Sequence, residues 1–99
     1  GWKDITISKK TDRSISKAAA LTYSGTGAPT VVAKGEGFIA KQIIDVADQY
    51  EVPLISDEQL VSVLINVPLG DEIPENLYLA IAEVLAHVYR LNGLIDTYD

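Results

Sequence analysis

The segment TVVAKGEGFIAKQIIDVADQY, residues Thr30–Tyr50, decides the fold class because its hydrophobic pattern changes from strand-like to helical within a few residues. Its first part, Thr30–Ala33, is β-branched or small and lies between Pro29 and Gly35, which predicts a buried strand. From Gly37 onward, apolar residues recur at helical spacing with charged and amide side chains between them. A strand followed at once by an amphipathic helix is typical of an α/β domain.

The predicted helix spans Gly37–Tyr50 and stops before Val52-Pro53, since the residue before a proline avoids the helical region. Pro53–Ile55 then predicts a short strand, which a parallel crossover would join to Thr30–Ala33. The apolar side of this helix, expected to be buried, comprises Ile39, Ile43, Val46, Ala47 and Tyr50.

The flanking segments extend the same pattern. Upstream, Ala18–Tyr23 precedes a glycine-rich turn and is expected to pair with Thr30–Ala33 as a hairpin. Downstream, Ser56 and Gln59 have capping-box spacing and predict a second helix, and Pro74–Leu91 predicts a third. The fold class is therefore α/β: a small mixed sheet of three to four strands, flanked by helices on both faces, in a single domain.

The chain ends are predicted to lie outside this domain. Residues 1–17 are interpreted as a polar basic arm, disordered or tag-derived, residues 18–92 as the domain and residues 93–99 as a C-terminal tail. Ile5 and Ile7 alternate with polar residues, which is a weak indication of a strand. The arm is expected to contribute little to stability. The lack of methionine suggests an excised or processed chain.

The amino-acid composition disfavours several classes of partner and binding site. The net charge is −6, from 14 acidic and 8 basic residues, which disfavours nucleic acid and anionic lipid as partners. The chain lacks cysteine, which excludes disulfides and thiolate-ligated metals, and the single histidine, His87, reads as a surface residue of the last helix. No apolar stretch approaches the length that spans a bilayer. No cofactor and no metal are expected.

Two local patterns suggest small-ligand chemistry, and each has a plainer explanation. Lys34–Gly37 joins the first strand to the helix and resembles a phosphate loop, but a lone G-x-G also serves as a tight turn. Asp71, Glu72 and Glu75 form an acidic cluster that suits a divalent cation, but carboxylates there also favour the start of the following helix.

Four longer motifs carry a family resemblance. They are Ala28–Gly35 (APTVVAKG), Val52-Pro53, Glu72–Tyr78 (EIPENLY) and Ala82–Leu91 (AEVLAHVYRL). Together they resemble the cytoplasmic C-terminal domain of the FlhB family, flagellar export-gate proteins with counterparts in virulence-type type III secretion. The resemblance extends over roughly Ala18–Leu91.

The resemblance implies a function in protein export. It implies a non-enzymatic protein-interaction module, similar to the substrate-specificity-switch domain of FlhB. Expected partners are export-apparatus proteins, export-substrate signal segments and the membrane part of an FlhB-type protein. The expected location is the cytoplasm, held at the inner membrane through the export apparatus. The residues that match the family's patch for short hydrophobic export signals are Ala28, Pro29, Ala82 and Leu85.

The chain also departs from the family. Family domains cleave themselves at an Asn-Pro-Thr-His loop, and the corresponding residues here are Arg13-Ser14-Ile15-Ser16, which lack the asparagine nucleophile. No autocleavage is therefore expected. Glu58–Ser62 also differs, because the family tends to have Pro-Pro-Leu-Ala-Arg there. The alternatives are a small phosphate- or nucleotide-binding domain using Lys34–Gly37, and a purely structural assembly subunit.

Overall fold

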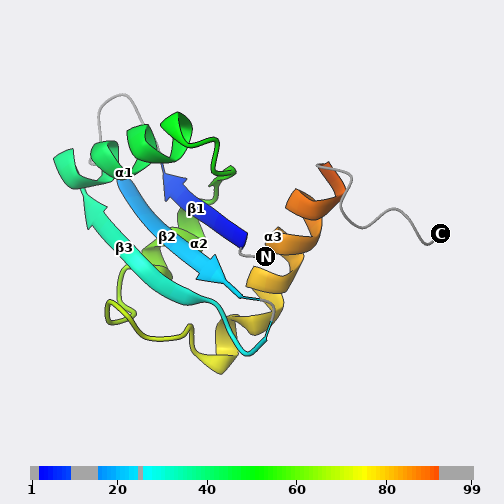
Figure 1. The fold of residues 1–99 in the computed structure, drawn as a ribbon. Coiled ribbons are helices and arrows are strands. Elements are labelled where there is room, and N and C mark those ends of the chain that lie inside the picture. Colours follow the sequence, from blue (N-terminus) through cyan, green and yellow to red (C-terminus); the bar gives the residue numbers. More distant parts are fainter. Residues whose placement is uncertain (1–2, 10–15, 25, 92–99) are drawn as a thin grey trace.

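Four strands form one mixed sheet with helices on both faces, as predicted (Figure 1). The computed structural model describes residues 3–9, 16–24 and 26–91. The sheet order is β3-β2-β1-β4; β1 and β4 pair in parallel, and the other neighbours are antiparallel. The elements are β1 (Lys3–Lys9), β2 (Lys17–Tyr23), β3 (Thr30–Glu36), α1 (Phe38–Gln49), β4 (Leu54–Ser56), α2 (Glu58–Leu64), the 3-10 helix η1 (Glu75–Leu77) and α3 (Tyr78–Leu91).

Strand β1 lies inside the sheet, within the segment that the sequence predicts to be a polar arm. It pairs with β2 along its whole length and with β4 over Thr6–Ser8. Ile5 and Ile7 are 2% and 0% exposed. The arm prediction is therefore wrong for Lys3–Lys9. Polar composition concealed this strand because Thr6 and Ser8, which alternate with the isoleucines, are buried as well.

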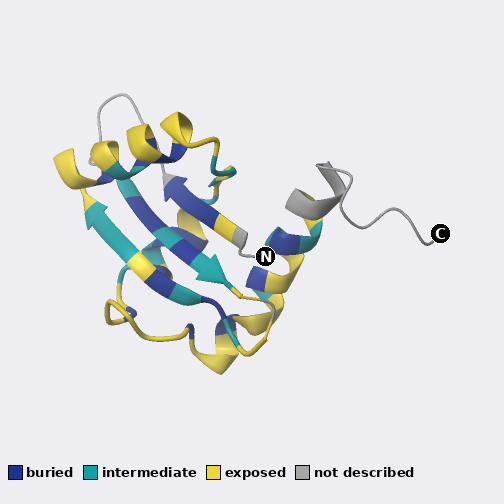
Figure 2. Cartoon of the chain, viewed as in Figure 1, coloured by how far each residue is buried: buried dark blue, intermediate teal, exposed yellow. Residues whose placement is uncertain are grey.

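The main core lies between the sheet and the two helices α2 and α3. Strand residues that alternate along the sheet point to this face, and apolar residues of both helices meet them there. Figure 2 shows the middle of β1 and parts of β2 buried, whereas the outer surface of α1 is exposed. The buried residues of this core are Ile5, Ile7, Ala19, Leu21, Val31, Leu60, Val61, Leu64, Val67, Ile73, Leu77, Ile81 and Leu85.

Helix α1 covers the opposite face through a much smaller core of Ala18, Ala40 and Ile44. The helix approaches β3 closely because Gly35 has no side chain. A β carbon on Gly35 would stand 2.7 Å from Cβ of Ile39. Small residues on both surfaces thus set the distance between α1 and the sheet.

The predicted buried side of α1 is only partly correct. Ala47 is buried and Ile43 half-buried, but Ile39, Val46 and Tyr50 are 48%, 52% and 71% exposed. The buried residues of α1 are Ala40, Ile44 and Ala47, so the buried side of the helix is turned away from the predicted one, although Ile39 still lies against Gly35.

The starts of the other two helices also differ from the prediction. Asp57, not Ser56, caps α2, and its Oδ1 accepts a hydrogen bond from the Leu60 amide at 3.0 Å. Pro74 precedes the single turn of η1, and α3 begins at Tyr78. In the part of the chain that the structure describes, no helix is long and apolar enough to cross a membrane.

The central position of β1 gives a first testable prediction. Ile7→Ala should lower the free energy of unfolding by about 2–4 kcal/mol, because it opens a cavity in a fully buried site. Val46→Ala, at a half-exposed position on α1, is the matched control and should change stability by less than about 1 kcal/mol. Denaturant melting measures both. Equal, small effects would mean that β1 does not form the centre of the core.

Candidate docking site

The four residues singled out by the resemblance come together in space. Ala28 and Pro29 lie just before β3, Ala82 and Leu85 lie on α3, and all four line one cavity of 420 Å³. Figure 1 shows the β2–β3 turn beside the first turns of α3. We call this cavity the docking site. Its other lining residues are Tyr23, Gly27, Glu72, Ile73, Tyr78 and Ile81.

Backbone hydrogen bonds between two distant segments build the site. The Ile73 amide donates to the Pro29 carbonyl at 2.9 Å, and the Val31 amide donates to the Asp71 carbonyl at 3.0 Å. An isolated antiparallel bridge joins Thr30 to Glu72 between them. Residues 71–73 thus run along the outer edge of β3. This pairing brings the chain that leads into α3 against the start of β3.

The floor and the rim of the docking site differ in exposure. Pro29, Ile73 and Leu85 are buried, and they form an apolar floor that is continuous with the main core. Ala82 and Glu72 are exposed, and Tyr78 is 47% exposed. Because Ala28 and Ala82 are small, they leave space above the floor. The arrangement suits an apolar side chain that enters from solvent.

Sequence reasoning located only part of this site. Leu85, one of the four patch residues, is 9% exposed and belongs to the main core as well as to the docking site. Glu72 and Ile73 belong to one of the motifs quoted above, but their contact with Pro29 depends on a long-range backbone pairing that no local pattern reveals.

The Lys34–Gly37 loop is engaged in structural contacts. The Lys34 ammonium donates to the Ile65 carbonyl at 2.9 Å and also to the Val67 carbonyl, just beyond α2. The Gly37 amide donates to the Ser16 carbonyl at 2.8 Å. A phosphate cradle needs free amides and a free cation at the helix start. Two of the groups that would supply them are already bonded within the protein.

The remaining candidates from the sequence are the Arg13–Ser16 positions, the acidic cluster and His87. Arg13, Ser14 and Ile15 lie outside the described residues, so only Ser16 of that group can be placed. The acidic residues Asp71, Glu72 and Glu75 are exposed, and no metal-binding cluster occurs among the described residues. His87 is exposed on α3. Among the described residues, no buried side-chain nitrogen or oxygen lacks a hydrogen-bond partner.

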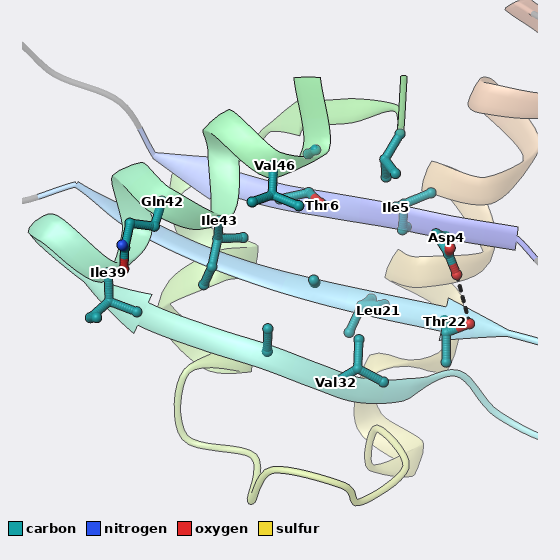
Figure 3. A pocket seen from close by; sticks show the side chains of 14 residues that line it. Asp4, Ile5, Thr6, Leu21, Thr22, Val32, Ile39, Gln42, Ile43 and Val46 are labelled. Carbon is teal, nitrogen blue, oxygen red and sulfur yellow. Dashed lines mark hydrogen bonds between the residues drawn. The ribbon is translucent and has the colours of Figure 1, made fainter. Parts of the chain in front are cut away.

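A second hollow, of 520 Å³, lies between α1 and the sheet and was not predicted (Figure 3). Val32, Ile39, Ile43 and Val46 contribute its aliphatic walls. It exists because α1 covers only part of this face of the sheet. At one end the Thr22 hydroxyl donates to the Asp4 carboxylate at 2.7 Å. The four patch residues Ala28, Pro29, Ala82 and Leu85 do not line this hollow.

Comparison with known proteins establishes the family. Residues 15–88 match the FlhB HrpN YscU SpaS family, and the chain belongs to it. It is 39% identical over 80 residues to the uncharacterised protein YlqH of Bacillus subtilis, which covers 79% of this chain and 86% of YlqH. It is 42% identical over 74 residues to the flagellar biosynthetic protein FlhB of Aquifex aeolicus.

Solved structures show the same fold. The cytoplasmic domain of FlhB from Shewanella putrefaciens superposes with a TM-score of 0.79 at 30% identity, covering 91% of this chain and 72% of that one. A mutated EscU C-terminal domain gives a TM-score of 0.71 at 29% identity, covering 84% of this chain and 81% of that one. The match with Aquifex aeolicus FlhB covers 72% of this chain but only 21% of that protein.

The contacts of Lys34 give a second prediction. Lys34→Met should lower the free energy of unfolding by about 1–3 kcal/mol, because two backbone carbonyls after α2 lose a charged donor. Lys41→Met, on the exposed side of α1, is the control and should be nearly neutral. Chemical denaturation distinguishes them. Full stability of the Lys34 variant would show that its ammonium is free for another role.

Proposed function

We propose that this domain is a non-enzymatic protein-interaction module of the flagellar or virulence-type type III export apparatus, similar to the substrate-specificity-switch domain of FlhB. Its family membership supports the pathway. One observation carries the role: Ala28, Pro29, Ala82 and Leu85 line a single apolar cavity whose rim is open to solvent. In this proposal the docking site receives short apolar export signals.

The proposal includes partners and a location. The direct partners are export-apparatus proteins, export-substrate signal segments and the membrane part of an FlhB-type protein. The domain would act in the cytoplasm, held at the inner membrane by the apparatus.

The two alternatives make different predictions in solution. A phosphate- or nucleotide-binding domain would need Lys34–Gly37 to release the bonds from Lys34 to the end of α2 and from Gly37 to Ser16. Nucleotide titration followed by NMR should then shift Lys34–Gly37. A purely structural subunit would respond to neither nucleotide nor export-signal peptide. A response to the peptide alone favours the interaction module.

Ala82 offers the sharpest test of the docking site. Ala82→Asp should weaken binding of an export-signal peptide at least tenfold, because a larger, charged side chain takes the space that the small Ala82 leaves above the apolar floor. The fold should remain intact, with a stability change below about 1 kcal/mol, since Ala82 is exposed. NMR titration measures the affinity, and thermal melting checks the fold.

Leu79→Asp is the matched control for this test. Leu79 lies on the same helix and is 73% exposed, but it does not line the docking site. This variant should bind the peptide like the parent chain. If Ala82→Asp remains folded and binds the peptide unchanged, then the docking site is not the peptide site.

Absence of autocleavage is a separate expectation. Arg13-Ser14-Ile15-Ser16 provides no asparagine side chain to attack the backbone, so the intact mass should persist during days of incubation near neutral pH. Mass spectrometry of the purified chain tests this. Two fragments that arise from a break between Arg13 and Ser16 would contradict it.

A further inference from the structure

We propose that the docking site selects peptides with a basic residue close to their apolar anchor, and that Glu72 recognises this residue. The inference rests on the proposed peptide-binding function and adds charge selectivity to it. Among the residues whose side chains the structure describes, Glu72 is the single carboxylate that lines the docking site, and no lysine or arginine lines it. An exposed carboxylate beside an apolar cavity favours a cation on the incoming chain.

The backbone holds Glu72 at a defined place on the rim. Its bridge to Thr30 and the Ile73–Pro29 hydrogen bond fix the segment on the edge of β3. Its Oε2 lies 3.5 Å from the point where a β carbon on Gly27 would stand. The carboxylate therefore rests against the turn that forms one wall of the cavity. Among the described residues it has no hydrogen bond or ion pair.

Glu72 also lies between two hollows. It lines the docking site and a neighbouring hollow of 310 Å³, whose walls include Pro68, Asp71 and Pro74. Because Glu72 lines both hollows, a peptide that runs from the docking site into the second hollow passes beside its carboxylate. Asp71 adds a second carboxylate on that path. A lysine or arginine within a few residues of the anchor comes within reach of both.

The described basic side chains do not compete for this carboxylate. The Lys17 ammonium donates to the Ser62 hydroxyl at 3.5 Å, and the Lys34 ammonium donates to the Ile65 carbonyl just after α2. Lys41 is exposed on α1, on the other face of the sheet. None of the three lines either hollow. The described side chains that line the site therefore carry negative charge without a neighbouring cation, which matches a partner that brings its own positive charge.

Charge-matched peptides test this inference. Three peptides share one phenylalanine anchor in a Gly/Ser background and carry lysine, glutamine or glutamate three residues from the anchor. The parent chain should bind the lysine peptide about two- to fivefold more tightly than the glutamine peptide, as expected for an exposed ion pair. The glutamate peptide should bind most weakly. Raising the salt concentration should reduce these differences.

Variants assign the preference to Glu72. Glu72→Gln should make the lysine and glutamine peptides nearly equal, and Glu72→Lys should reverse the order so that the glutamate peptide binds best. Asp48→Lys, at an exposed position on α1, changes the net charge by the same amount as Glu72→Lys. It should keep the order of peptide affinities found for the parent chain. Thermal melting confirms that each variant is folded.

The outcomes separate this inference from the proposed function. Binding of all three peptides with equal affinity, at a site that Ala82→Asp destroys, would overturn the charge selectivity and leave the docking site in place. A preference for lysine that persists in Glu72→Lys would also overturn it. Failure of every peptide to bind the parent chain would instead overturn the peptide-binding function itself.

Discussion

The pairing of β1 with both β2 and β4 is the constraint on which the rest of the structure depends. Strand β4 has three residues, and its ladder is with β1, so without β1 it would have no place in the sheet. Two flanking hydrogen bonds extend this ladder, from the Thr6 amide to Pro53 at 3.0 Å and from the Asp57 amide to Ser8 at 2.9 Å. Since Asp57 also caps α2, β1 positions the start of that helix as well.

The covalent link between β1 and β2 therefore matters for the stability of the sheet. The two strands pair residue by residue from Lys3–Tyr23 to Lys9–Lys17, and residues 10–16 join them in sequence. A backbone break within that link would leave β1 held by its ladders and by Ile5 and Ile7 alone. An intact link keeps β1 at a high effective concentration beside β2. In this family member, continuity of the chain and integrity of the core are thus connected.

Local sequence patterns predicted the strands and helices whose hydrophobic spacing is regular. They did not predict the features that depend on pairing between distant segments. The β-branched run at Thr30–Ala33 and the period of Pro74–Leu91 indicated the elements, because hydrophobic spacing follows from strand and helix geometry. Strand β1 was missed in the sequence because Thr6 and Ser8, which alternate with its isoleucines, are polar yet buried. The four site residues came from the resemblance, whereas Glu72 joins them only through the backbone pairing with Thr30, which sequence spacing does not encode.

The floor of the docking site belongs to the buried core, whereas its rim is exposed to solvent. Ile73, Ile81 and Leu85 belong both to the floor and to the main core, so substitutions there would alter stability together with binding. Ala82, Glu72 and Tyr78 are exposed, so they can change with little effect on the core. Apolar burial on the floor gives affinity without discriminating among apolar anchors. Under the proposed function, selectivity among peptides with similar apolar anchors would arise at the rim, where Glu72 carries a charge.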